Sequence, residues 1–334
     1  MEISAYAATE SGKDLVPFNY DSGDLGPDEI LVAITHCGIC YSDVSFIDDH
    51  FGGTGYPLVA GHEVIGTVTH VGTNVDHLAV GQRVGVGPQC ASCLNCSYCA
   101  SGREILCSEK QLTIGGGNRG GFGNAMKVDA NFAFAIPENL DSVNAAPLLC
   151  AGLTTYSPLA HHTRPGMRVG VIGIGGLGHL ALQYANKMGL EVTALSSSDK
   201  KKEEAMALGA HHFVNTSDPE AMAGAVNSVD FILSTIYADL DWVSYMSLLR
   251  PDGRFCIVGA SMNPIDMPAA LLTVNQHHIS GGAAGGRADM MEMLQFSSRH
   301  GITAKTEVMP VSEINAALEK VRNNEVRYRM VLEI

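Results

Sequence analysis

The sequence predicts a two-domain α/β protein that joins a β-rich, barrel-like unit to a parallel sheet built of βαβ units. The chain has 334 residues, a length that corresponds to about two domains of ordinary size. Glycines punctuate the first 150 residues between short strand-like segments, as in barrel-like β units. Beyond residue 150, strand-like and helix-like segments alternate, and such alternation indicates βαβ units and a parallel sheet.

The first part of the chain is expected to consist mainly of strands. Residues 29–36 (EILVAITH) and 64–71 (VIGTVTHV) are rich in β-branched side chains and alternate in part, so both are predicted strands. The glycine cluster that begins at Gly115 (GGGNRGGFG) is interpreted as a loop that enters another strand.

The second part begins with a short apolar strand at 168–173 (RVGVIG), followed by a helix at 176–188 with apolar residues at helical spacing. The series then continues with these predicted elements: strand 191–196, helix 200–208, strand 212–215, strand 229–234 and strand 253–259. Near the end, residues 311–321 form a predicted amphipathic helix and residues 328–334 a final strand.

Composition and charge exclude several classes of protein. Hydrophobic residues make up 46% and charged residues 17% of the chain, which is a globular balance. The formal net charge of −14 argues against nucleic acid or an anionic membrane as the main partner. There is no run of apolar residues long enough for a transmembrane helix and no secretory signal at the start. We therefore expect a cytoplasmic protein with reduced thiols.

Five of the nine cysteines lie between residues 90 and 107, and such bunching indicates a metal site rather than disulfides. Four thiolates would bind a tetrahedral zinc ion that organises this short lobe. One possible ligand set is Cys90, Cys93, Cys96 and Cys107, and the other is Cys93, Cys96, Cys99 and Cys107. We favour the second because its last spacing closes a shorter loop at lower entropic cost. Free or disulfide-bonded cysteines are the alternative.

The segment from Gly173 to Gly178 reads G-x-G-x-x-G and lies between a predicted strand and a predicted helix. In that context the pattern indicates a dinucleotide site, because bare backbone at Gly175 lets a pyrophosphate approach the helix N-terminus. The alternative is a tight glycine turn within an α/β sheet.

The end of the next strand bears on the choice of cofactor. An acidic residue about 20 positions after the glycine motif would bind the ribose 2′-hydroxyl of NAD. Here the strand ends at Ser196, and Lys200 or Lys201 follows shortly after. Hydroxyls and an ammonium group can receive the 2′-phosphate of NADP, so we expect NADP. In the alternative, Asp199 takes the NAD role.

Cys40, the pair His62-Glu63, and Cys150 are dispersed candidates for a second metal site, which no spacing rule joins. Two cysteines and a histidine with an open fourth position form one recognised catalytic zinc arrangement.

Several motifs in order resemble those of the zinc-containing alcohol dehydrogenases of the medium-chain dehydrogenase/reductase family. The run GHEVIG from Gly61, followed by Gly72 and Val75, is similar to the signature GHE-x-x-G-x5-G-x2-V of that family. The run CGICYSD from Cys37 resembles its C-G-I-C-x-[ST]-D motif. The run CAGLTTYSPL from Cys150 resembles a segment of the cinnamyl alcohol dehydrogenase-like subfamily that bears a zinc ligand.

The resemblance implies a GroES-like β-barrel catalytic domain and a Rossmann-type doubly wound parallel sheet. The catalytic domain would comprise residues 1–151 and 286–334, with a structural zinc lobe at 90–107, and the Rossmann domain residues 152–285. It also implies a second zinc ion, making one structural and one catalytic ion per chain.

The resemblance also implies roles for individual residues. Cys40, His62 and Cys150 would bind the catalytic zinc with Glu63 beside it, Asp43 would orient His62, and Ser42 would pass the alcohol proton. Arg329 would reach the cofactor phosphates. The pyrophosphate site would be shaped by Gly173, Gly175, Gly176, Leu177 and Gly178, and the NADP-selecting positions would be Ser196, Ser198 and Lys201. Where the family often has a proton-relaying histidine, three residues after Ser42, this chain has Ser45.

The expected reaction is hydride transfer between NADP(H) and a primary alcohol or aldehyde, aromatic compounds included, by a zinc-dependent dehydrogenase that forms a homodimer. One alternative is an NAD-dependent polyol or formaldehyde dehydrogenase of the same fold. Another is a non-catalytic, zinc-stabilised nucleotide-binding protein. A zinc-free quinone reductase is disfavoured because Cys40, His62 and Cys150 are all present.

Overall fold

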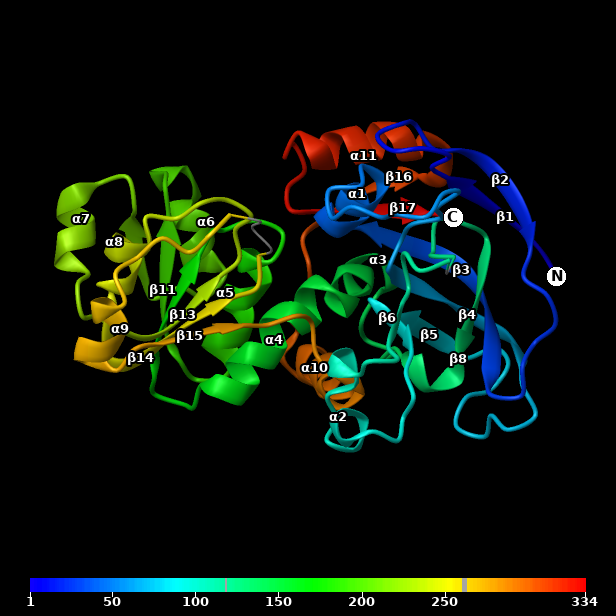
Figure 1. Ribbon diagram of the computed structural model, residues 1–334, viewed down its shortest axis with the longest axis horizontal. Helices are drawn as coiled ribbons and strands as arrows, with labels where there is room; N and C mark the ends of the chain where they lie inside the picture. The colour runs from blue at the N-terminus through cyan, green and yellow to red at the C-terminus, as the bar shows by residue number, and fades with distance from the viewer. Residues whose placement is uncertain (118, 260–262) are drawn as a thin grey trace. The chain divides into compact units, whose positions relative to one another are not determined.

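The computed structural model describes residues 1–117, 119–259 and 263–334, which form two compact units (Figure 1). Unit 1 consists of Met1–Ala151 and Gly285–Ile334, and unit 2 of Gly152–Ala284. Within the predicted glycine loop, Asn118 lies outside the described residues. No described helix has the length and apolar character needed to cross a membrane.

Unit 1 is built around a seven-stranded sheet in the order β16-β17-β3-β4-β5-β9, with β8 paired to β3. All pairs are antiparallel except β16 with β17. The strands of this sheet are β3 (Glu29–Ile39), β4 (Glu63–Val71), β5 (Arg83–Val86), β8 (Ala125–Asp129), β9 (Ala133–Ala135), β16 (Thr306–Pro310) and β17 (Arg329–Glu333).

The remaining elements of unit 1 surround this sheet. Two small hairpin-like sheets are formed by β1 (Glu2–Ala7) with β2 (Val16–Asp21) and by β6 (Gln89–Ala91) with β7 (Gln111–Leu112). Its helices are α1 (Tyr41–Ile47), α2 (Ser97–Ala100), α3 (Ser142–Ala145), α10 (Arg287–His300) and α11 (Ile314–Arg322). The 3₁₀ helices are η1 (Glu104–Leu106), η2 (Ala130–Phe132), η3 (Ala146–Leu149) and η5 (Val311–Glu313).

The core of unit 1 forms where alternating apolar side chains of β3 and β4 meet those of neighbouring strands. Ile30, Val32, Val64, Val84 and Phe122 are fully buried in one cluster. The predicted strands at 29–36 and 64–71 are confirmed, and the first continues to Ile39. It continues because β17 pairs with its last residues, Val331 opposite Gly38. This extension carries the chain directly to Cys40.

Unit 2 is a six-stranded parallel sheet in the order β12-β11-β10-β13-β14-β15, and Figure 1 shows the helices that flank it. Its strands are β10 (Arg168–Ile172), β11 (Glu191–Ser196), β12 (His212–Asn215), β13 (Val229–Ser234), β14 (Leu249–Ile257) and β15 (His278–Gly281). Its helices are α4 (Ala151–His162), α5 (Gly178–Lys187), η4 (Asp199–Lys201), α6 (Lys202–Ala207), α7 (Pro219–Gly224), α8 (Trp242–Met246) and α9 (Ala270–Asn275).

This strand order reverses direction at β10, which pairs with β11 on one side and β13 on the other. Such a switch point is where dinucleotides bind in doubly wound sheets, at the carboxyl ends of the strands. The predicted strands and helices of this half are confirmed with small changes at their ends. For example, β14 begins at Leu249 and not at residue 253, because Leu249 already pairs with Val229.

Candidate active site

Four dispersed ligand-type residues, Cys40, His62, Glu63 and Cys150, converge in unit 1. Each offers one ligand atom, and these atoms all lie within 4.8 Å of one another, with all four residues buried. The pairing of β3 with β4 brings the segments together, because Gly38 lies opposite Glu63. Cys40 then caps the start of α1, and Cys150 directly follows η3.

Asp43 ties two of these segments together. Its carboxylate is fully buried and accepts hydrogen bonds from the backbone N–H of Cys40 at 2.8 Å and of Gly61 at 2.8 Å. The same carboxylate lies 2.9 Å from Nδ1 of His62. A buried carboxylate with three partners holds the imidazole in one orientation and leaves Nε2 for a ligand.

The other ring nitrogen of His62 faces a sulfur. Nε2 lies 3.2 Å from Sγ of Cys150, and Sγ of Cys40 lies 3.7 Å from the hydroxyl of the half-buried Ser42. Ser45 is buried, whereas His50 is exposed. Ser42 is therefore the hydroxyl that the described contacts bring to the edge of the cluster.

The two cysteine thiols of the cluster need a cation if both are to be ionised. A hydrogen bond from Cys150 holds the pKa of Cys40 well below its ordinary value, and this contact together with burial raises the pKa of Cys150 well above its own. Burial alone would lower the pKa of His62, but the Asp43 carboxylate raises it well above the ordinary value. Both thiols can ionise together only if a cation compensates them. Two sulfurs, an imidazole and a carboxylate suit Zn²⁺.

Glu63 also pairs with Arg329 at the start of β17. The guanidinium donates to Oε1 of Glu63, and both side chains are buried. Burial raises the pKa of Glu63 to about 7, although the positive charge of Arg329 opposes this shift. Oε2 of Glu63 and Nε of Arg329 have no hydrogen-bond partner among the described residues. Two buried polar atoms without partners mark a place where a further ligand fits.

Gly38 is required by this arrangement. A Cβ atom at Gly38 would lie 2.0 Å from Oε2 of Glu63, so any larger residue would displace the carboxylate from the cluster. This glycine lies within the run that begins at Cys37, but the sequence alone predicts no role for it.

The second cluster lies in the lobe at 90–107, also in unit 1. The structure brings together the sulfurs of Cys93, Cys96, Cys99 and Cys107, all within 4.8 Å of one another. Individual sulfur separations are 3.5 Å for Cys93–Cys107 and 3.6 Å for Cys96–Cys99. The thiol of Cys90 instead donates to the carbonyl oxygen of Gln111 at 3.5 Å.

The glycine motif in unit 2 forms a bare turn after β10. Gly173 has φ +84°, a value that favours glycine, and a Cβ atom on Gly178 would lie 1.8 Å from the carbonyl oxygen of Gly173. Nothing lies within 4 Å of a Cβ atom built on Gly175, so the backbone there is open to a ligand. Leu177 is the N-cap of α5. Gly176 lies in the same turn.

Thr235 supports this turn, although it lies outside every motif recognised in the sequence. Its hydroxyl donates to the carbonyl oxygens of Ile172 at 2.8 Å and Gly173 at 2.9 Å. Because Thr235 directly follows β13, it joins the two strands at the switch point. This contact depends on β13 lying next to β10 in the sheet, and the glycine motif carries no information on strand order.

The residues expected to select the cofactor surround the end of β11. Ser196 is half-buried at the strand end, and the hydroxyl of Ser198 accepts from the backbone N–H of Lys200 at 3.3 Å. The ammonium group of Lys201 donates to the carbonyl oxygen of Ile174 at 2.7 Å, so it lies over the glycine turn. Asp199 accepts from the side chain of Asn215 at 3.0 Å.

Two family models match the chain. An alcohol dehydrogenase GroES-like domain matches residues 26–138, and a zinc-binding dehydrogenase matches residues 176–299. An aldehyde reductase of Synechocystis sp. is 41% identical over 331 residues, which cover 99% of this chain and 98% of that protein.

Solved structures agree with these matches. A cinnamyl alcohol dehydrogenase (CAD) of Sorghum bicolor superposes with a TM-score of 0.95 and 37% identity, covering 100% of this chain and 98% of the other. A CAD of Helicobacter pylori complexed with NADP(H) superposes with a TM-score of 0.91 and 29% identity, with coverage of 100% and 98%.

A GroES-like unit with two sets of zinc-type ligands, together with a six-stranded parallel sheet and its glycine turn, defines a zinc-binding dehydrogenase. The chain belongs to the zinc-containing alcohol dehydrogenases of the medium-chain dehydrogenase/reductase family, and within them to the cinnamyl alcohol dehydrogenase-like group. The expected family, fold class and alcohol/aldehyde dehydrogenase activity are thereby confirmed.

Proposed function

We propose that this protein is an NADP(H)-dependent, zinc-dependent alcohol dehydrogenase that interconverts primary alcohols and aldehydes, and that Cys40, His62 and Cys150 hold its catalytic zinc. The observation that carries the proposal is the convergence of these three buried side chains from separate segments of unit 1. Two cysteines and one histidine leave a fourth position for substrate, as catalytic zinc sites require.

When bound, the zinc ion acts as a Lewis acid for the substrate oxygen, while NADP(H) donates or accepts the hydride. Asp43 acts through His62: it fixes the ring so that Nε2 points at the cluster. Ser42 holds the hydroxyl at the edge of the cluster and accepts or donates the alcohol proton. Glu63 supplies a buried carboxylate beside the metal, and Arg329 keeps it in place.

We further propose that the lobe sulfurs of Cys93, Cys96, Cys99 and Cys107 hold a second, structural zinc ion. A closed set of four thiolates leaves no position for substrate. The lobe has little secondary structure of its own, with α2, η1 and the end of β6 within its described residues, so a metal would stabilise it.

The choice of NADP rests on the end of β11. No carboxylate stands at Ser196, where it would repel a 2′-phosphate, and Lys201 lies over the glycine turn. Asp199, the candidate for an NAD role, is bound to Asn215. The relative from Helicobacter pylori is complexed with NADP(H), which supports the same choice.

Metal content and turnover together test this function. Zinc is measured in the purified protein, and NADPH oxidation is followed with benzaldehyde-like, cinnamaldehyde-like and short aliphatic aldehydes. We expect two zinc ions per chain and turnover of at least one aldehyde class. Turnover only with NAD⁺ and a polyol or formaldehyde adduct would favour the alternative dehydrogenase. A single zinc ion per chain without any turnover would contradict the proposal.

Ser196→Asp tests the cofactor. The new carboxylate would repel the 2′-phosphate and offer an acceptor to the NAD ribose, so the ratio of kcat/KM for NADPH over NADH should fall by at least about tenfold. Ser197→Asp, one position further on and exposed, is the control. An unchanged ratio in Ser196→Asp would remove Ser196 from the 2′-phosphate site.

We also propose a homodimer in a reducing, cytoplasmic setting. β15 forms one edge of the six-stranded sheet, and an unpaired edge offers backbone groups to a second copy. None of the nine cysteines is part of a disulfide, as expected where thiols stay reduced. Light scattering coupled to gel filtration measures the mass in solution, and a monomer at micromolar concentration would contradict the dimer.

A further inference from the structure

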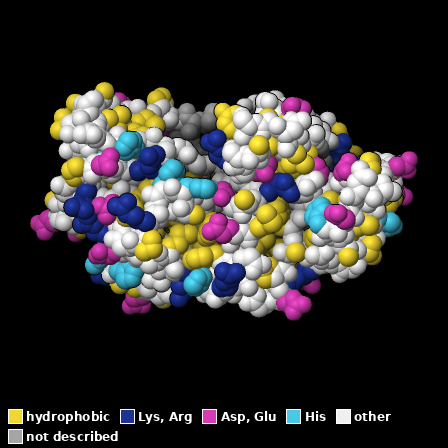
Figure 2. Space-filling model, turned by 90° about the horizontal axis from the view of Figure 1, so that it is seen from below, with side chains coloured by type: hydrophobic (Ala, Val, Ile, Leu, Met, Phe, Trp, Pro, Cys, Tyr) yellow, Lys and Arg dark blue, Asp and Glu magenta, His cyan; other side chains and the backbone are white. Residues whose placement is uncertain are grey.

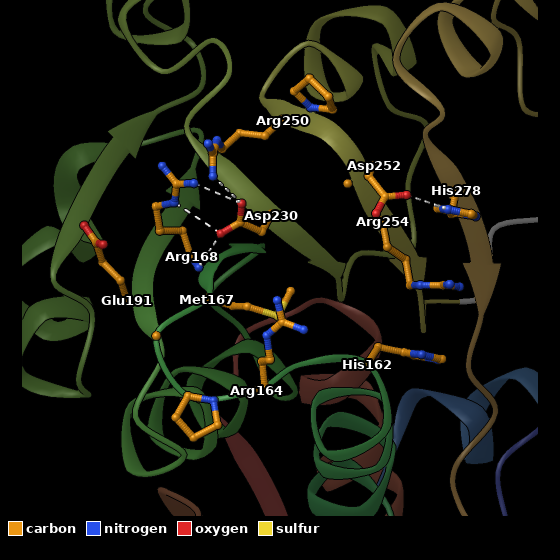
Figure 3. A pocket seen from close by; sticks show the side chains of 14 residues that line it. His162, Arg164, Met167, Arg168, Glu191, Asp230, Arg250, Asp252, Arg254 and His278 are labelled. Carbon is orange, nitrogen blue, oxygen red and sulfur yellow. Dashed lines mark hydrogen bonds and ion pairs between the residues drawn. The ribbon is translucent and has the colours of Figure 1, made fainter.

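Unit 2 contains a cavity of about 780 Å³ at the edge of its sheet opposite the glycine turn (Figure 3). Its lining residues include the first or second residue of five of the parallel strands (β10, β11, β13, β14 and β15), for example Arg168 at β10 and His278 at β15. The glycine turn follows the carboxyl end of β10. Because a strand rises about 3.3 Å per residue, roughly 17 Å separates Arg168 from Gly173. A ligand in this cavity would not occupy the cofactor position.

The cavity is rich in cations, although the chain carries a formal net charge of −14. Four arginines and two histidines line it: Arg164, Arg168, Arg250, Arg254, His162 and His278. Figure 2, seen from below, shows Lys, Arg and His side chains gathered on the side of the view where Figure 1 draws unit 2.

The carboxylates of the cavity are already paired. Asp230 accepts from Nε and Nη2 of Arg168 at 3.1 and 3.0 Å, and from Nη1 of Arg250 at 3.0 Å. Asp252 lies 3.3 Å from Nε2 of His278. Glu191 lies 2.8 Å from Nε2 of His212. Figure 3 draws the Asp230 and Asp252 contacts as dashed lines.

Two arginines remain without a partner. Within the described residues, neither Arg164 nor Arg254 has an ion pair or a side-chain hydrogen bond. In Figure 3, Arg164 lies between the Asp230 cluster and His162, with Arg254 on the His162 side. Burial lowers the pKa of His162, and the positive charge of Arg254 lowers it further.

We propose that this cavity binds a doubly charged oxyanion of the phosphate or phosphate-ester type through Arg164 and Arg254. Guanidinium groups bind phosphate oxygens through paired, charge-assisted hydrogen bonds. The anion would compensate two cations that have no protein counter-charge. The cavity lies in the size range of small-molecule sites, so it has room for a phosphorylated metabolite as well as for free phosphate. This site is independent of the proposed dehydrogenase function.

Calorimetric titration of the zinc-loaded full chain with inorganic phosphate tests the site. The titration is done at low ionic strength in the presence of saturating NADP⁺, which blocks the cofactor cradle. We expect saturable binding that added NaCl weakens. Acetate, with a single charge, should bind more weakly than phosphate. Ribose 5-phosphate distinguishes the sources: tighter binding than inorganic phosphate indicates an ester, and equal binding indicates the free ion.

Arg164→Gln and the double variant Arg164→Gln/Arg254→Gln should weaken phosphate binding, the double variant by at least about tenfold. Arg164 is exposed, so its single substitution leaves the fold intact. Arg103→Gln, an exposed arginine in unit 1, is the control and should bind phosphate like the parent. The proposal would be overturned if phosphate binding were unchanged in the double variant, or if acetate bound as tightly as phosphate. It would also be overturned if NADP⁺ abolished phosphate binding.

Discussion

The two candidate zinc clusters of unit 1 use similar atoms in different ways. The lobe cluster consists of four sulfurs, two of them only half-buried. The cluster around Cys40 has mixed sulfur, nitrogen and oxygen donors, all buried. It is also surrounded by buried polar partners, Asp43 and Arg329. A closed set of thiols suits a structural ion, whereas a mixed set with a fixed imidazole leaves room for substrate chemistry.

The sharpest test of this contrast is Cys150→Ser. Loss of one sulfur ligand from the mixed cluster should reduce kcat/KM for aldehyde reduction at least about 10³-fold, because the metal stabilises charge on the substrate oxygen. The zinc content should fall from two ions per chain to one, with little change in the melting temperature. Cys37→Ala, a buried cysteine outside both clusters, should retain activity. Full activity in Cys150→Ser would contradict the assignment of the mixed cluster as the catalytic metal site.

Loss of a sulfur ligand from the lobe should instead reduce stability and leave kcat unchanged. Cys107→Ser removes a fully buried sulfur and should lower the free energy of unfolding by about 3 kcal/mol, because metal binding and folding are coupled. Molecules that remain folded should keep their kcat. Urea unfolding and kinetics at low temperature measure the two quantities. Cys90→Ser serves as the matched control, and loss of kcat without loss of stability in Cys107→Ser would contradict the assignment.

Asp43→Asn tests the buried carboxylate that orients the histidine of the mixed cluster. The amide keeps the shape but removes the charge behind His62, so the affinity of the mixed cluster for zinc should fall by about 10–100-fold. Activity should return as free zinc is raised, while the lobe ion stays bound. Asp76→Asn, whose parent side chain is 98% exposed, is the control. Activity that added zinc fails to restore would show a role other than positioning.

The smallest expected effect concerns how the lobe is anchored. Glu104 of the lobe is buried and accepts from the backbone N–H of Arg287 at 3.1 Å. Glu104→Gln should therefore cost about 1–2 kcal/mol of unfolding free energy without altering the zinc content. Glu109→Gln, at an exposed position two residues after the lobe, should cost nothing measurable by urea unfolding. Loss of lobe zinc in Glu104→Gln would mean that zinc binding by the lobe depends on the hydrogen bond between Glu104 and Arg287.

The two clusters also differ in how much of each ligand set could be predicted from the sequence. The lobe cysteines are near neighbours in the chain, so loop entropy alone favoured the set that the structure brings together. Cys40, His62 and Cys150 could be joined only through a family resemblance, because strand pairing rather than spacing unites them. Of the three partners of Asp43, His62 was expected from the resemblance. The backbone N–H of Cys40 belongs to the local cap of α1, whereas the backbone N–H of Gly61 could not be predicted, because it comes from a segment 18 positions away that only the fold brings to Asp43.

In unit 2, sequence periodicity predicted the strand series because buried parallel strands are short apolar runs. The role of Thr235 needed the strand order. Arg329 was expected at the cofactor phosphates, and the described structure places its guanidinium against Glu63. The cavity at the amino ends of the strands carries no local motif, because its arginines come from two distant parts of the chain, Arg164 and Arg168 before and at the start of β10, and Arg250 and Arg254 in β14.

The two clusters also imply an order of assembly. Cys93 and Cys107 are 14 positions apart, so the lobe can close as soon as a short stretch of chain has emerged. His62 and Cys150 are 88 positions apart, and contacts across such distances form late because long loops close slowly. A nascent chain in a zinc-poor cell would thus fill the lobe first. Such a cell would accumulate well-folded but inactive protein.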